Sequence, residues 1–187
     1  SLAGAAAIAF LAAPAQAEDK FTYMTNWYAQ AEHGGFYQAV AQGIYKKYGL
    51  DVTIKMGGPQ VNITQMMAAG QADCIMGSSD IQMMQVREGG VPVVNVAAFF
   101  QKDPQVLIAH DDVKGFEDLK GKTLLIGAQA NRGYWPWLKA KFGLKDEQTR
   151  PYTFNIQPFV ADKNTAQQGY LTSEPYAIQK AGVKSTV

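Results

Sequence analysis

The sequence predicts an α/β protein with two lobes, each built on a mostly parallel sheet flanked by helices. Short stretches of β-branched and aromatic residues alternate with segments whose apolar residues recur at helical spacing. This alternation runs through residues 18–109, stops at the polar stretch 110–122, and begins again at residue 123. We therefore expect a first lobe at 18–109, a boundary segment at 110–122 and a second lobe at 123–187.

The first lobe is expected to alternate strand and helix from its start. Phe21 and Tyr23 alternate with polar residues as in a strand, and Phe36, Val40 and Ile44 recur at helical spacing after two glycines. Further strands are expected at 51–56, 73–76, 91–100 and 105–109, and further helices around 63–67 and at 81–87. The nearly continuous apolar run at 91–100 is typical of a strand buried on both faces.

The second lobe is expected to repeat this plan. A strand at 123–126 is followed by the loop 127–133 and by a helix that carries Tyr134 and ends at Gly143. A strand is expected at 152–159 and a helix at 164–168, before a short strand and the polar loop 173–175. No further strand pair is visible before Val187, so we expect this lobe to be incomplete.

The first seventeen residues have the composition of a secretory signal. Residues 2–13 are an almost unbroken run of small apolar residues, and Pro14 is followed by Ala15-Gln16-Ala17, which is typical of a cleavage site. The run is shorter than the roughly 20 apolar residues that span a bilayer. We therefore expect 1–17 to be part of a signal peptide that is removed before Glu18.

The charges of the chain nearly balance. There are 17 Lys and Arg against 16 Asp and Glu, a formal net charge of +1, so we expect neither a nucleic acid nor an anionic membrane as a partner. Cys74 has no second cysteine to pair with, and only two histidines, His33 and His110, are present. We expect no metal site and no cofactor.

Polar and aromatic residues gather in the loops between strand ends and helix starts, where open α/β sheets place their ligands. The candidate ligand-binding residues are Asn26, Trp27, Tyr28, His33, Gln60, Asn62, Ser78, Ser79, Gln129, Asn131, Tyr134, Trp135 and Glu174. Some of these have a purely structural alternative. Trp27 and Tyr28 could cover the edge of the sheet, and His33 could be a helix cap or a surface group.

A flat heterocycle could lie against Trp27 or Tyr28 on one side and against Tyr134 or Trp135 on the other. Trp137 is expected in the core. Helix starts and Arg132 favour an anion, whereas Asp80 and Glu174 favour an amino-substituted ring or a cation. On balance we expect a neutral or weakly cationic heterocycle.

Several segments together resemble the type II periplasmic solute-binding proteins of ABC importers. The resemblance is to the branch of nitrate, sulfonate and taurine binders and thiamine-pyrimidine-precursor binders. The matching positions are 1–17, Asn26, Trp27, His33, Gly35, Tyr37, 68–73, 115–122 and 173–175. The phrase at 115–122 is specific for the superfamily, and the loop at Asn26 is closer to the branch shared with thiamine-pyrimidine synthases.

This resemblance implies a periplasmic-binding-protein type II fold with a small solute held between two lobes. It also implies a periplasmic location, delivery to an ABC permease in the inner membrane, a monomer when complete, and no enzymatic activity. Alternatives are a binder of a small anion, a sensor lobe, or a synthase that consumes a pyridoxal phosphate lysine and a histidine, for which His33 is the candidate. Synthases of that kind carry a cysteine-rich motif, whereas this chain has Cys74 alone.

Overall fold

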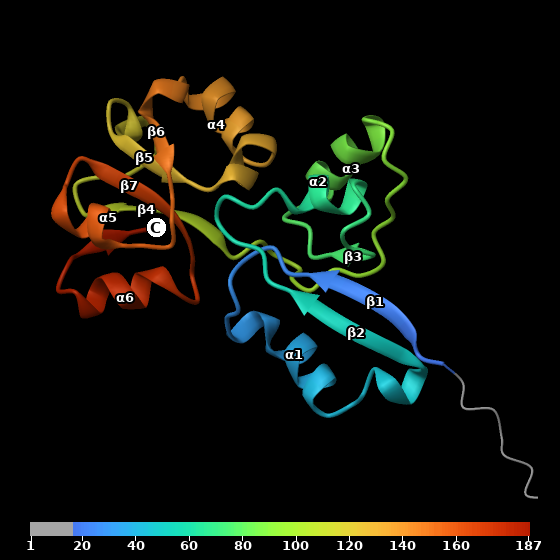
Figure 1. Ribbon diagram of the computed structural model, residues 1–187. Coiled ribbons are helices and arrows are strands. Elements are labelled where there is room, and N and C mark those ends of the chain that lie inside the picture. The colour runs from blue at the N-terminus through green and yellow to red at the C-terminus, as the bar shows by residue number, and fades with distance from the viewer. Residues whose placement is uncertain (1–16) are drawn as a thin grey trace, which may run out of the picture.

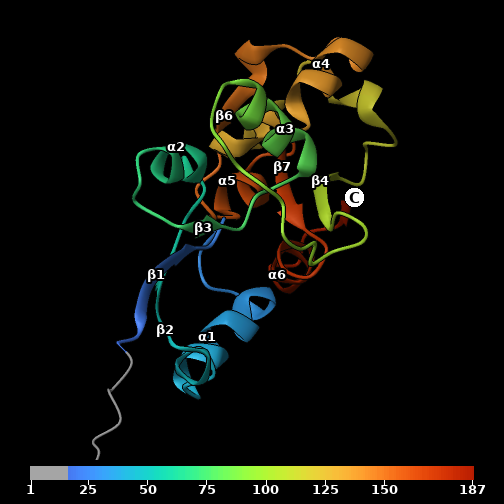
Figure 2. The ribbon, with the colours of Figure 1, turned by 90° about the vertical axis from the view of Figure 1, so that its right-hand side faces the viewer.

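A computed structural model of the protein describes residues 17–187, so most of the expected signal segment lies outside the described residues. The chain forms two α/β lobes that lie side by side (Figure 1), and in a view turned by 90° part of the first lobe lies in front of the second (Figure 2). The first lobe holds a three-stranded sheet and the second a five-stranded sheet. An α/β architecture of two lobes is therefore confirmed.

The first sheet is entirely parallel, with the strand order β2-β1-β3. Its elements are β1 (Asp19–Met24), α1 (Gly34–Ala41), β2 (Leu50–Lys55), α2 (Ile63–Ala68), β3 (Cys74–Ile75) and α3 (Asp80–Glu88), with short 3-10 turns η1 (Ala31–His33) and η2 (Lys46–Tyr48). Parallel neighbours need a crossover, and α1 and α2 supply the two crossovers here. Met24 of β1 packs on Ile63 of α2 in a small core.

The second sheet is mixed, with the strand order β6-β5-β7-β4-β8. Its strands are β4 (Gln105–His110), β5 (Thr123–Ile126), β6 (Thr149–Pro151), β7 (Thr165–Tyr170) and β8 (Ser185–Thr186). Its helices are η3 (Phe116–Leu119), η4 (Ala128–Arg132), α4 (Trp135–Phe142), η5 (Asp146–Gln148), α5 (Gln157–Ala161) and α6 (Glu174–Lys180). Strand β4 runs antiparallel to β7 and β8, while β5 is parallel to β6 and β7.

The second lobe holds the larger core. Leu124 and Ile126 of β5 pack against Trp135 and Leu138 of α4 on one face of the sheet. On the other face, Ile108 of β4 packs with residues of α5 and α6. Each sheet face is thus covered by helices that carry their apolar residues inward.

Most of the predicted elements are present, but 91–100 is not a strand. This segment has no regular structure, and Val94 and Val96 are 74% and 81% exposed. An apolar run becomes a buried strand only where a neighbouring strand pairs with it and a helix covers it. Neither is provided within the part of the chain that the structure describes.

Two predictions in the second lobe are also wrong. The strand expected at 152–159 lies earlier, as β6, and α5 begins within the expected range with Pro158 in its first turn, a position that suits proline. The helix expected at 164–168 is instead the central strand β7. Its alanine and glutamines are good helix formers, but burial between β5 and β4 overrides that preference.

The sheet membership of β4 also differs from the expected grouping. Residues 105–109 were placed with the first lobe, whereas β4 pairs with β7 of the second sheet from Gln105 to Ile108. The exact lobe limits stay a prediction.

Among the described residues, no helix combines the length and apolar character needed to cross a membrane.

Candidate ligand-binding site

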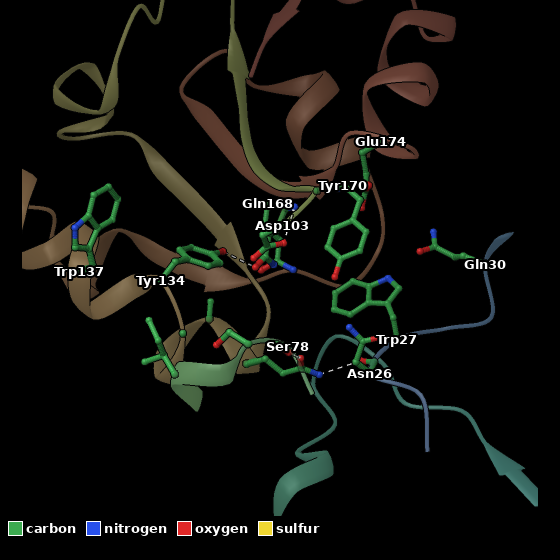
Figure 3. Close-up of a pocket in the computed structure, with 17 residues that line it drawn as sticks. Asn26, Trp27, Gln30, Ser78, Asp103, Tyr134, Trp137, Gln168, Tyr170 and Glu174 are labelled. Atoms are coloured by element: carbon green, nitrogen blue, oxygen red, sulfur yellow. Dashed lines mark hydrogen bonds between the residues drawn. The ribbon is translucent and has the colours of Figure 1, made fainter. Parts of the chain in front are cut away.

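A cavity of about 330 Å³ lies between the two lobes (Figure 3). The first lobe contributes the loop after β1 and the start of α3, and the second contributes η4, the start of α4 and the end of β7. The wall is completed by Asp103, in the segment before β4, and by Gln105, the first residue of β4. The volume suits a small ligand of about one substituted ring.

Asn26 is held in the wall by His33. The buried imidazole of His33 accepts a hydrogen bond at Nδ1 from the backbone N–H of Gln30, at 3.2 Å, so its proton is on Nε2. Nε2 then donates to Asn26 Oδ1 at 3.0 Å. Burial lowers the pKa of His33, and the Glu32 carboxylate opposes this shift, so the ring is neutral at pH 7. With its oxygen engaged, the Asn26 amide presents its NH₂ group for donation.

Glycine at position 57 lets the loop after β2 pack against this part of the wall. A Cβ at Gly57 would lie 2.3 Å from the carbonyl oxygen of Thr25, which is too close for any side chain. The Gly57 N–H donates to Thr25 Oγ1 at 3.3 Å, and Thr25 Oγ1 donates to the carbonyl of Trp27 at 2.8 Å. The backbone that carries Asn26 and Trp27 is therefore fixed from behind.

Ser78, Ser79 and Gln129 connect the two lobes at the cavity. Ser79 caps α3 by accepting from the Gln82 N–H at 3.2 Å. Ser78 Oγ donates across the lobes to Gln129 Oε1, and Gln129 Nε2 donates to the carbonyl of Asn26 at 2.9 Å. Trp27, Ser78 and Gln129 thus line one cavity although they come from distant parts of the chain.

Aromatic rings form much of the lining. Trp27 lies on the first-lobe side, and Tyr134, Trp137 and Tyr170 lie on the second-lobe side. Trp27 stacks on Tyr152, with ring centroids 6.0 Å apart and planes inclined by 20°, which fixes its orientation. Aromatic faces on both sides suit a flat ring.

Two carboxylates, Asp103 and Glu174, line the cavity, and within the described lining there is no lysine, arginine or histidine. Glu174 is buried, and both of its oxygens are engaged by protein donors. Oε1 accepts from the Tyr152 hydroxyl at 2.8 Å, and Oε2 accepts from the Tyr170 N–H at 2.9 Å. Burial raises the pKa of Tyr152, and the negative charge of Glu174 raises it further. The cavity is therefore acidic rather than basic.

Of the predicted site residues, those in the lining are Asn26, Trp27, Ser78, Ser79, Gln129, Tyr134 and Glu174. The lining does not include Tyr28, His33, Gln60, Asn62, Asn131 and Trp135. A direct ligand role for any of them stays a prediction.

Three of the residues outside the lining have a clear structural role. His33 supports Asn26, Asn62 caps α2 by accepting from the Gln65 N–H at 3.2 Å, and Gln60 donates to the Tyr152 carbonyl at 3.1 Å. Tyr28 packs beside Phe154 and is 39% exposed.

The two tryptophans of α4 exchange their expected places. Trp135 is 1% exposed and lies in the core, where its Nε1 donates to Asp146 Oδ1 at 2.7 Å. Trp137, which we expected in the core, is 49% exposed and lines the cavity. Residues two apart on a helix point in very different directions, so only one of them can face the sheet.

Sequence reasoning missed part of the lining. The additional residues are Gln30, Ile81, Asp103, Gln105, Ala130, Gly133, Trp137, Gln168, Gly169 and Tyr170. Gln30 lies in a loop that already pointed to a site. Gln168 lies in the range 164–168, where a helix is expected, and this expectation conceals that the carboxyl end of β7 opens into the cavity; Tyr170 lies just beyond that range.

The fold and the cavity together define an α/β binding-protein fold, with a small-ligand cavity between two lobes. The sequence matches the NMT1/THI5 like family over residues 30–187, so the chain belongs to that family. The resemblance to the branch with thiamine-pyrimidine proteins is thereby confirmed.

Individual relatives are distant and longer. The chain is 26% identical to 4-amino-5-hydroxymethyl-2-methylpyrimidine phosphate synthases of Aspergillus parasiticus, over 57% of the chain and 32% of that protein, and of Schizosaccharomyces pombe, over 67% and 37%. It is 27% identical to a Haemophilus influenzae protein named for thiamine biosynthesis, over 61% of the chain and 37% of that protein. The chain thus spans about a third of the length of these relatives.

The expectation that the chain is not an enzyme is contradicted by these relatives, because the proteins it resembles in Aspergillus and Schizosaccharomyces are named as synthases. The expectation of no enzymatic activity rests on the resemblance to the solute-binding proteins of ABC importers. Within the described lining there is no lysine to hold pyridoxal phosphate, and His33 lies outside the lining, so these residues do not fit that group.

Proposed function

We propose that the cavity between the lobes binds a flat, amino-substituted heterocycle, namely a pyrimidine of the kind that thiamine contains. The observation that carries this proposal is the chemistry of the described lining. Aromatic faces lie on both sides, amides are held in fixed orientations, and two carboxylates are present without a lysine, arginine or histidine. Such a lining supports stacking of a ring and acceptance of hydrogen bonds from its amino group.

The same chemistry disfavours the small-anion alternative. A bound sulfonate or nitrate would lie near Asp103 and Glu174 with no cationic side chain to offset the repulsion, which is costly inside a cavity. Arg132, which could have favoured an anion, is exposed and lies outside the lining. A phosphate ester of the pyrimidine would meet the same repulsion.

Calorimetric titration tests the binding proposal. The panel is 4-amino-5-hydroxymethyl-2-methylpyrimidine, its phosphate ester, taurine and nitrate. We expect binding of the free pyrimidine, binding of the phosphate ester at least about tenfold weaker because of charge repulsion, and no binding of taurine or nitrate. Preferential binding of an anion, or no binding of either pyrimidine, would overturn the proposal.

One use of such binding is synthesis of the pyrimidine, and the names of the relatives support it. The described lining does not fit pyridoxal phosphate, so this use is tested directly: the protein is incubated with pyridoxal phosphate, and formation of the pyrimidine phosphate is followed by mass spectrometry. Product above a heat-denatured control supports synthesis. Lack of product contradicts this use and leaves the proposed pyrimidine binding standing.

A second use is delivery of the pyrimidine to an ABC permease in the inner membrane. The signal-like sequence at 1–17 supports this candidate, because it is typical of export to the periplasm. Fractionation of cells that produce the protein tests it. Recovery in the periplasm, shortened by the signal, supports delivery, and recovery only in the cytoplasm contradicts it.

A further inference from the structure

Asp103 is an acceptor at the cavity that sequence reasoning did not single out. It lies in the segment between α3 and β4, and it lines the same cavity as Gln168 (Figure 3). Its Oδ1 accepts from the Gln105 N–H at 2.9 Å, which holds the side chain in place. Its Oδ2 has no protein donor among the residues that the structure describes.

Asp103 differs in this respect from Glu174, the other acid of the lining. Each oxygen of Glu174 already accepts a protein hydrogen bond, from Tyr152 or from Tyr170. Glu174 therefore holds the second lobe together at the cavity, whereas Asp103 has an oxygen to offer to a ligand. The charge of Asp103 also acts on two phenols of the lining: burial is the main cause that raises the pKa of Tyr134 and of Tyr170, and the charge of Asp103 adds to both shifts.

Gln168 supplies a donor in the same cavity. Its Oε1 accepts from the Gly127 N–H at 2.5 Å and from the Tyr134 hydroxyl at 3.1 Å. A backbone N–H can only donate, so the oxygen of the amide must face Gly127, and this fixes the orientation of the side chain. Nε2 of Gln168 is left with two hydrogens to donate, and no protein acceptor lies within reach in the described part of the chain.

We propose that Asp103 and Gln168 together determine specificity by reading the edge of an aminopyrimidine. On that edge an exocyclic amino donor stands beside a ring-nitrogen acceptor, and the two side chains present the complementary acceptor and donor. Asp103 Oδ2 accepts from the amino group, and Gln168 Nε2 donates to the ring nitrogen. This inference rests on the proposed pyrimidine binding and adds which chemical group of the ligand is recognised, and by which residues.

Two-point reading of this kind gives selectivity for the amino group. A ligand that lacks the amino group offers no donor to the free oxygen of Asp103 and therefore loses that hydrogen bond. Stacking against Trp27 and Tyr134 is insensitive to that change, because every pyrimidine has the same flat face. Selectivity for the amino group therefore reports on Asp103, which accepts from that group, rather than on the aromatic walls.

The test compares two ligands and three forms of the protein. The ligands are 4-amino-5-hydroxymethyl-2-methylpyrimidine and its analogue with hydrogen in place of the 4-amino group. The proteins are the wild type, Asp103→Asn and the matched control Asp111→Asn, which removes an exposed aspartate away from the cavity. We expect Asp103→Asn to weaken binding of the amino compound about tenfold, to leave the analogue unchanged, and Asp111→Asn to change neither.

Each other outcome is decisive. Equal weakening of both ligands by Asp103→Asn, or no preference of the wild type for the amino compound, overturns this inference while pyrimidine binding stands. Binding of neither ligand by the wild type overturns the proposed function as well. Gln168→Leu provides a second measurement. It should weaken binding of the amino compound and of the analogue by a comparable factor, because both ligands keep the ring nitrogen to which Gln168 donates. Unchanged binding of both ligands would overturn the role of Gln168.

Discussion

Individual side chains at this site divide into those that face the cavity and those that hold them there. Asn26 faces the cavity, and His33 fixes its amide from behind. The sequence placed both residues in one loop but could not separate the two roles. That separation depends on which ring nitrogen accepts from the Gln30 backbone, a contact that no residue pattern encodes.

Acidification is expected to destabilise the protein through His33. Burial lowers its pKa in the folded state, so the unfolded chain binds more protons over the range in which the ring titrates. The stability that His33 contributes is present above the unfolded pKa of about 6.5 and is lost as the pH falls through the folded-state pKa. Urea unfolding at about pH 7.5 and about pH 5 measures this loss.

The control for this pH effect is His33→Gln, which cannot be protonated. Its free energy of unfolding should fall less than that of the wild type between the two pH values. A fall of the same size in both proteins would mean that His33 is not the group responsible.

Trp27→Ala is expected to weaken binding of the pyrimidine about tenfold, since an aromatic contact adds about 0.5 to 1.5 kcal/mol beyond burial. Trp27→Phe keeps a flat face and should retain most of the affinity. Calorimetry is the suitable measurement, because it records heat and does not need the fluorescence of the tryptophan that is removed. Unchanged affinity in Trp27→Ala would exclude stacking on this residue.

At the scale of elements, prediction succeeded where local pattern and tertiary position agree. The strand expected at 123–126 is β5 exactly, because its apolar residues suit a strand with neighbours on both sides. Prediction failed for β7, whose polar, helix-favouring sequence is buried in the middle of the sheet. It failed again for 91–100, where an apolar sequence stays exposed. Whether such a segment becomes a strand depends on the strands that pair with it, and the sequence of the segment itself does not contain that information.

Helix α4 illustrates the same limit and provides a test. Trp135→Ala should lower the free energy of unfolding by about 3 to 5 kcal/mol, because the side chain is fully buried in the core. Trp137→Ala removes a half-exposed ring from the same helix and should cost less than about 1 kcal/mol. Urea unfolding of both variants checks this, and equal losses would contradict the assigned orientation of α4.

At the scale of the whole molecule, the two lobes are held together around the cavity by direct contacts. Gln60 Nε2 donates to the Tyr152 carbonyl at 3.1 Å, and the Ala128 N–H donates to the Pro59 carbonyl at 2.8 Å. Gln30 Nε2 donates to Ser173 Oγ at 3.1 Å on another side. The sequence predicted two lobes and a shared site, but the bonds that join the lobes follow only from the folded arrangement.

Gln60→Ala is expected to weaken ligand binding about threefold, although Gln60 does not line the cavity, because one bond between the lobes is lost. Gln71→Ala, which removes an exposed glutamine from the first lobe, is the matched control and should bind as the wild type does. Calorimetry with the same pyrimidine compares the three proteins. An unchanged affinity in Gln60→Ala would mean that this bond does not contribute to the binding arrangement.

A crystal structure of the protein with 4-amino-5-hydroxymethyl-2-methylpyrimidine tests the central claim most directly. We expect the ring to lie between Trp27 and Tyr134, with its amino group within hydrogen-bonding distance of Asp103. A ligand bound elsewhere on the protein, with the cavity between the lobes left free of it, would contradict the account.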